Sequence, residues 1–74
     1  NMIHQILIFT TSVSNKKQIK HIKALLQNSF KIFDISVDFD DWEKILRVEC
    51  SDVSESEIIS KLRTININAA VLNH

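Results

Sequence analysis

Residues 32–50, IFDISVDFDDWEKILRVEC, carry the strongest secondary-structure signal in the chain. From Ile32 to Phe39 apolar and polar residues alternate, which is the period of a half-buried β-strand. The polar cluster from Asp40 to Glu43 turns the chain, and Ile45 to Cys50 returns as a second strand. This stretch therefore predicts a β-hairpin with one face in a protein core.

A strand and a helix are predicted before this hairpin. Residues 3–10 form an apolar, β-branched run of strand length. Ser14 or Asn15 then offers a side-chain oxygen that can cap a helix, and Asn28, which tolerates left-handed geometry, is the expected stop. Lysines lie opposite an apolar stripe at helical spacing, formed by Ile19, Ile22, Leu25 and Leu26.

A second helix and a last strand are predicted after the hairpin. Ser54 and Glu57 have the spacing of a capping box. Asn66 is the expected end of this helix, and residues 67–72 form the last strand. The inner stripe of the helix comprises Ile58, Ile59, Leu62 and Ile65.

This order predicts an α+β, ferredoxin-like βαββαβ sandwich, a four-stranded antiparallel sheet with two helices on one face. Right-handed crossovers place the first and third strands in the middle. We expect a single domain over residues 2–74, with Asn1, which precedes the only methionine, outside the native start.

Composition and charge favour an ordinary globular domain. Of 74 residues, 45% are apolar and 24% are charged, and nine basic residues balance nine acidic ones. The only cysteine excludes an intramolecular disulfide. No stretch resembles a signal peptide or a membrane span, so we expect a cytoplasmic protein with no membrane partner. A basic surface is predicted at Lys16, Lys17, Lys20 and Lys23.

The alternation of the strands also predicts an apolar patch on the open side of the sheet. If Ile6 and Ile8 face the helices together with Ile35, Val37, Leu46, Val48, Ala69 and Val71, their neighbours face outward. The outward set is Leu7, Phe9, Ile45, Ala70 and Leu72. We interpret this set as an interface, for a homodimer or another protein partner, and the alternative is an apolar face that stays in solvent. Trp42 at the hairpin tip is either a lid over the core edge or a binding anchor.

No residue pattern indicates an enzyme. Cys50 is in phase with Leu46 and Val48 and is interpreted as core packing. His4, His21 and His74 lack the spacing of metal ligands. The lysine face has the charge to contact phosphates, but the expected third strand has no aromatic residue on which a base stacks, so nucleic acid is not an expected partner.

The chain resembles the heavy-metal-associated domains of copper chaperones and metal-transporting ATPases. Those domains carry Gly-Met-x-Cys-x-x-Cys between the first strand and the first helix. Aligned on the apolar frame, Ser12 takes the Gly position, Val13 the Met position, and Asn15 and Gln18 the two Cys positions. The frame comprises Ile19, Ile22, Leu26, Ile32, Ile35, Val37, Phe39, Leu46 to Glu49, Ser54 to Leu62, Asn66, Ala69 and Val71.

This alignment implies a domain of heavy-metal-associated type with a degenerate metal loop. Amides cannot replace the thiolates that bind monovalent copper or zinc, so we expect no metal and no cofactor. The hairpin and third strand are also similar to those of small uncharacterised bacterial proteins with this loop. The expected function is a protein-interaction or scaffold module. A residual copper or zinc role and a small-molecule-sensing regulatory module are the alternatives.

Overall fold

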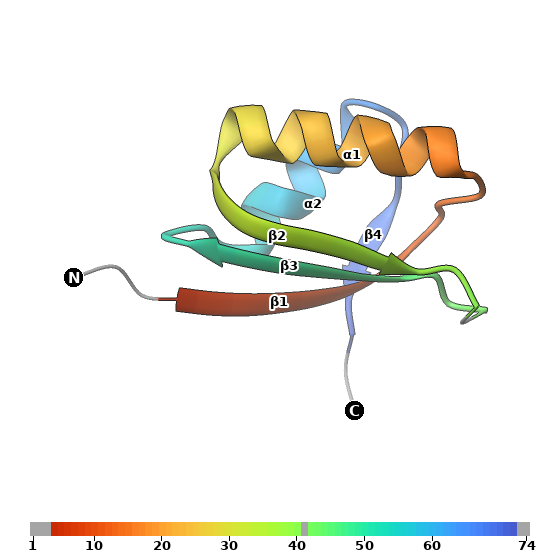
Figure 1. Cartoon of the computed structure of the whole chain (residues 1–74), viewed down its shortest axis with the longest axis horizontal. Coiled ribbons are helices and arrows are strands. Elements are labelled where there is room, and N and C mark those ends of the chain that lie inside the picture. Colours follow the sequence, from red (N-terminus) through yellow and green to blue (C-terminus); the bar gives the residue numbers. More distant parts are fainter. Residues whose placement is uncertain (1–3, 41, 73–74) are drawn as a thin grey trace.

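Six elements make up the fold, in the order strand, helix, strand, strand, helix, strand. The computed structural model describes residues 4–40 and 42–72. The elements are β1 (His4–Thr11), α1 (Lys16–Ser29), β2 (Lys31–Asp38), β3 (Ile45–Ser51), α2 (Glu55–Arg63) and β4 (Ala69–Val71). Figure 1 shows both helices on the same side of the sheet. The expected start of the domain at residue 2 and the expected start of the first strand at residue 3 lie outside the described residues.

The sheet has the order β2-β3-β1-β4, with every neighbouring pair antiparallel. The α+β, ferredoxin-like βαββαβ arrangement is therefore confirmed, with β1 and β3 in the middle. The last strand is shorter than predicted, because β4 spans only Ala69–Val71 and the Ile67 N–H donates to the Leu62 carbonyl of α2 instead of to a neighbouring strand. In the described residues, neither helix is long and apolar enough to cross a membrane.

Side-chain caps fix where both helices begin. Asn15 caps α1, and Ser54 and Glu57 close the predicted capping box of α2. The Ser54 backbone N–H donates to the Glu57 carboxylate at 2.9 Å, and this bond lowers the pKa of that group. The predicted end of the helix at Asn28 is wrong, because α1 continues to Ser29. The N–H of Phe30 also donates to the Leu26 carbonyl of the last helical turn.

The chain makes its tight turns without glycine. Asn66, after α2, has φ 62°, in the left-handed region that asparagine tolerates. Lys44 and Asp52, at φ 51° and 60°, occupy the same region in the turns before and after β3. Asparagine therefore occupies only one of the positive-φ positions among the described residues.

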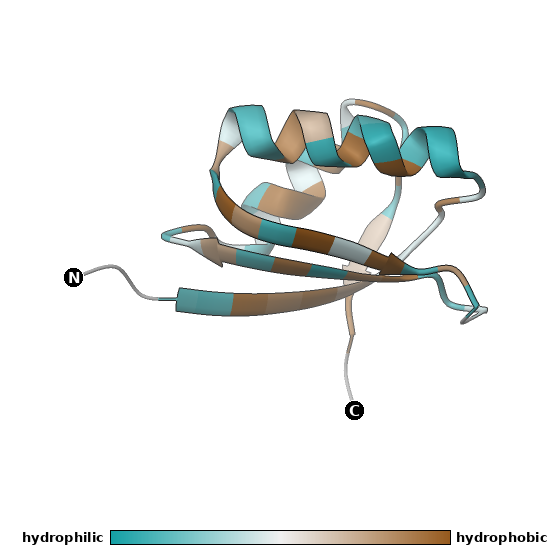
Figure 2. Ribbon diagram, viewed as in Figure 1, coloured by the Kyte–Doolittle hydropathy of each residue, from teal (hydrophilic) through white to brown (hydrophobic). Residues whose placement is uncertain are grey.

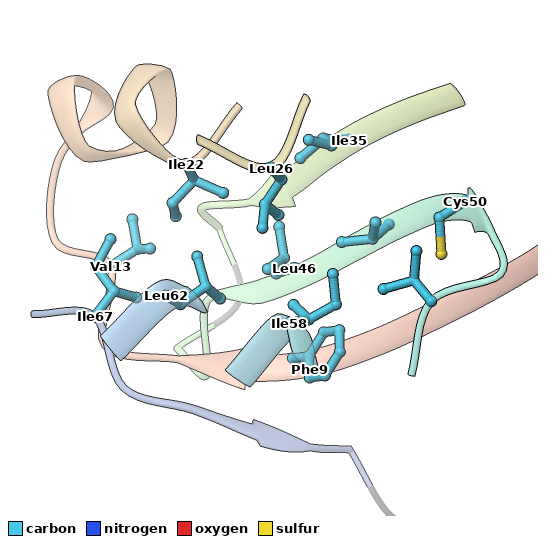
Figure 3. Close-up of a cluster of buried hydrophobic side chains, with 12 residues drawn as sticks. Phe9, Val13, Ile22, Leu26, Ile35, Leu46, Cys50, Ile58, Leu62 and Ile67 are labelled. Carbon is cyan, nitrogen blue, oxygen red and sulfur yellow. The ribbon is translucent and has the colours of Figure 1, made fainter. Parts of the chain in front are cut away.

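The core lies between the helices and the sheet. Ile22 and Leu26 of α1 and Ile58 and Leu62 of α2 are fully buried against the inner side of the sheet (Figure 3). Colouring by hydropathy shows hydrophilic and hydrophobic residues interspersed along the α1 ribbon (Figure 2). The remaining buried apolar residues are Phe9, Val13, Ile35, Leu46, Val48, Cys50, Val53 and Ile67.

The predicted orientation of β1 is wrong. Phe9 is 0% exposed and Leu7 packs against the core, whereas Ile6 is 49% exposed. The register explains this, because Phe9 pairs with Leu46 and Leu7 with Val48, and paired residues share a face. Residues 6–9 are all apolar, so alternation could not define which of them face inward.

Candidate interaction face

The side of the sheet turned away from the helices, here called the open face, is the candidate functional site. On β1 it carries Ile6 and Ile8, which pair with Glu49 and Arg47 of β3. Two large apolar side chains therefore lie beside a carboxylate and a guanidinium on one surface. Of the predicted interface residues, Ile45 pairs with Asp38, Ala70 pairs with Thr10, and Leu72 follows β4, all on or beside this face.

Leu7 and Phe9, the other two predicted interface residues, do not belong to the open face. Phe9 lies in the core beside Ile58, where Figure 3 shows its ring. Gln5 alternates with Leu7 and Phe9 along β1 and so shares their inward face. Its side-chain oxygen accepts a hydrogen bond from the Val53 N–H at 3.1 Å. The inward positions of β1 are thus fixed by one buried aromatic ring and one partly buried hydrogen bond.

Phe33 joins the open face through a β-bulge. The register of β2 and β3 shifts between Ile32 and Asp34, which leaves Phe33 as an additional residue on β2. Its side chain is 46% exposed, and its ring lies 5.0 Å from the His4 ring, centroid to centroid. Sequence analysis missed this residue, although the adjacent apolar pair Ile32-Phe33 interrupts strict alternation and was an available signal.

Charged groups of both signs lie beside these apolar side chains. Arg47 Nη1 and Glu49 Oε1 are 2.8 Å apart, and His4 Nε2 lies 3.5 Å from the other Glu49 oxygen. The Arg47 and Glu49 side chains are 42% and 24% exposed. Exposed pairs of this kind add about 0–1 kcal/mol to stability, so their main effect is on the surface potential.

The loop between β1 and α1 is used for capping and packing. The Gln18 N–H donates to Asn15 Oδ1 at 2.9 Å, and Gln18 Oε1 accepts from the Ser14 N–H at 2.6 Å. Val13 is buried in the core. The Asn15 and Gln18 side chains are therefore held in helix-capping hydrogen bonds, and this donor set does not fit a soft metal.

The described residues contain no group of three or more His, Cys, Asp or Glu side chains placed to hold a metal ion. His4 contacts Phe33 and Glu49, and His21 lies on the exposed side of α1. His74 lies outside the described residues.

The hairpin tip projects away from the core. Trp42 is 84% exposed, so the interpretation of Trp42 as a lid is wrong. The base of the hairpin is tied to β1, because the Thr11 hydroxyl donates to the Lys44 carbonyl at 2.8 Å and the Thr11 N–H donates to the Glu43 carbonyl at 3.2 Å. Lys44 Nζ donates to the Phe39 carbonyl at 3.3 Å. The side chain of Trp42 therefore stands out from an anchored turn.

The predicted basic surface divides into two parts. Lys16, Lys20 and Lys23 line a groove between α1 and β2, whereas Lys17 is exposed on α1 away from that groove.

Cys50 is a packed core thiol. It is 0% exposed, and burial raises its pKa. A chain of this size has a free energy of unfolding of roughly 4–11 kcal/mol. We therefore expect a maleimide to label Cys50 at least about a thousandfold more slowly in the native protein than in urea. Rapid labelling of the native protein would contradict this burial.

The raised pKa also gives a pH dependence with a defined sign. At alkaline pH the unfolded thiol loses its proton before the folded one, so the unfolded state binds fewer protons and native stability falls as pH rises. Urea unfolding between pH 8 and pH 10 measures the effect, and Cys50→Ala removes this contribution from the slope.

A search of protein-family models and a search of curated proteins each find no match to this chain.

Proposed function

We propose that this chain is a non-enzymatic protein-interaction or scaffold domain that self-associates weakly through the open face. The observation that carries the proposal is the exposure of Ile6 and Phe33, at 49% and 46%, on the side of the sheet away from both helices. Exposed apolar side chains gathered on one face among polar groups are typical of interaction surfaces. The Arg47–Glu49 pair is the polar part of this face and lies on β3, between Ile6 of β1 and Phe33 of β2.

A second copy is the partner that this surface fits best. In a two-fold dimer the same patch meets itself, so a charged patch is self-complementary only if it contains both signs of charge. Arg47 and Glu49 meet that requirement, because Arg47 of each copy is able to pair with Glu49 of the other copy.

The expected affinity of this dimer is low. Burying roughly 300 Å² of apolar surface per copy contributes about 7 kcal/mol per copy, or on the order of 15 kcal/mol per dimer, before the cost of association. Association costs of similar size remove much of that gain, so we expect dimers only at high protein concentration.

The proposal includes a relation to the heavy-metal-associated domains in which the loop no longer handles metal. The element order and the place of Asn15 and Gln18 at the start of α1 support this relation. Their capping hydrogen bonds supply a structural reason for amide side chains at these positions. A cytoplasmic location is part of the same proposal.

Sedimentation velocity across a range of concentrations tests the dimer. For the parent chain we expect the sedimentation coefficient to rise with concentration. Ile6→Asp places a carboxylate beside Glu49 in the apolar patch and is expected to keep the protein monomeric throughout.

Ala24→Asp is the matched control, because it adds the same charge at an exposed position of α1. This variant is expected to self-associate like the parent. A parent chain that stays monomeric at millimolar concentration, or an Ile6→Asp variant that associates as strongly as the parent, would contradict the proposal.

A further inference from the structure

A groove separate from the open face runs between α1 and β2. Its volume is about 450 Å³, and its apolar lining includes Ile19, Ile35 and Val37. Lys16, Lys20 and Lys23 also line it. An apolar groove with cationic side chains fits a ligand that is both extended and acidic.

The groove reaches the free edge of the sheet. β2 is the terminal strand and pairs only with β3 among the described strands, so its other edge carries backbone N–H and C=O groups that a further strand can pair. Ser36 also lines the groove, although its register partner Arg47 belongs to the open face. We interpret the Ser36 contribution as main chain, which places the groove against the β2 backbone.

The helix side of this edge is cationic. Residues 1–33 include no aspartate or glutamate, so no carboxylate of α1 neutralises its lysines. The acidic residues of β2, Asp34 and Asp38, pair with Glu49 and Ile45 on the open face of the sheet. A strand added at β2 therefore meets lysines on its helix side.

The spacing of the lysines matches that of an extended peptide. Lys16 and Lys20 are four residues apart on a helix, or about 6 Å along its axis. Alternate residues of a strand are about 6.7 Å apart. Figure 1 shows α1 lying over β2 with the two elements running side by side. Alternate acidic side chains on one strand are therefore able to face successive lysines.

A second copy of the chain is disfavoured as the occupant. Antiparallel pairing of two β2 edges across a two-fold axis places both α1 helices on the same side of the joined sheet. The two lysine rows then approach each other and repel. We propose that this groove binds an extended acidic segment of a partner protein, which adds to β2 as a fifth strand.

This inference is independent of the proposed dimer, because it uses the edge of the sheet and not the open face. The test uses a fluorescein-labelled ten-residue peptide in which glutamate alternates with valine or threonine, followed by fluorescence anisotropy. Two further peptides serve as comparisons. In one of them lysine replaces each glutamate. In the other, proline replaces alternate valine and threonine residues and so removes backbone N–H donors. We expect binding by the glutamate peptide alone.

Lys20→Glu and Lys17→Glu form the matched pair of variants. Lys20 lines the groove, whereas Lys17 carries the same charge on the same helix outside it. We expect Lys20→Glu to weaken binding about tenfold and Lys17→Glu to weaken it less than about twofold. Amide chemical shift changes on peptide addition are expected to concentrate in β2.

Three outcomes would overturn the inference. Equal weakening by both variants would indicate non-specific attraction to the helix. Equal binding of the proline peptide would show that backbone pairing at β2 plays no part. If no peptide binds at millimolar concentration, the groove is not a peptide site, and the lysines instead prevent another strand from pairing with this edge.

Discussion

Phe9→Ala is expected to lower the free energy of unfolding by about 3–5 kcal/mol, a large share of the roughly 4–11 kcal/mol of a chain of this size. The Phe9 ring is fully buried on the central strand β1 and lies beside Ile58 of α2. Removing it leaves a cavity between the sheet and α2, and the surroundings are able to fill only part of that space. Phe9→Lys adds a buried charge and is expected to prevent folding.

Ile6→Ala is the control for this prediction, since Ile6 lies on the same strand but is 49% exposed. Its expected cost is below about 1 kcal/mol, measured at concentrations where the chain is monomeric. Urea unfolding followed by far-ultraviolet circular dichroism compares the two. Tryptophan fluorescence is a poor reporter here, because Trp42 is exposed in the folded state. A greater loss in Ile6→Ala than in Phe9→Ala would show that the orientation of β1 is reversed.

The double substitution Asn15→Cys and Gln18→Cys is expected to create a site for monovalent copper that the parent lacks. In the parent, Asn15 caps α1 and its side chain lies at hydrogen-bonding distance from the Gln18 N–H, so the two side chains start from the same turn. Thiolates are favoured at a helix N-terminus beside Lys16 and Lys17, because positive charge lowers a thiol pKa. Two thiolates bind soft metals far more tightly than two amides do.

Competition with a chromogenic copper chelator under reducing conditions measures this gain. The control is Asn15→Ser and Gln18→Ser, which keeps side-chain oxygens for capping but supplies no sulfur. We expect one copper ion per chain in the cysteine variant and none in the control. Equal affinity in the two variants would show that the loop does not have the geometry of a metal loop. Tight stoichiometric binding by the parent, lost on Cys50→Ser, would instead favour the residual metal role.

The sequence predicted the helices well because capping signals are local. Asn15, Ser54 and Glu57 act through hydrogen bonds to backbone groups at most three residues away, so neighbouring residues suffice to identify them. The hairpin was predictable for a similar reason, since Ile35 and Val37 alternate with polar residues. The element order then restricted the topology to a common arrangement.

The open face was predicted only in part because its composition depends on distant pairing. Ile6 and Phe9 are similar in hydropathy, and only the pairing of β1 with β3, more than 35 residues away, determines which of them is buried. The bulge at Phe33 also changes phase within one strand. The groove beside β2 requires α1 to lie over that edge, which is a tertiary feature with no sequence motif of its own.

The central position of β1 has a consequence for the order in which the molecule assembles. Of these six elements β1 leaves the ribosome first, yet its partners are β3, which ends at Ser51, and β4, which ends at Val71. The nascent chain therefore carries an apolar, unpaired strand until β3 has emerged, and one edge of that strand stays unpaired until β4 follows. Contacts of this separation slow folding and leave an intermediate open to aggregation. Chaperone demand in the cell is thus set by the place of this strand in the topology more than by the number of residues.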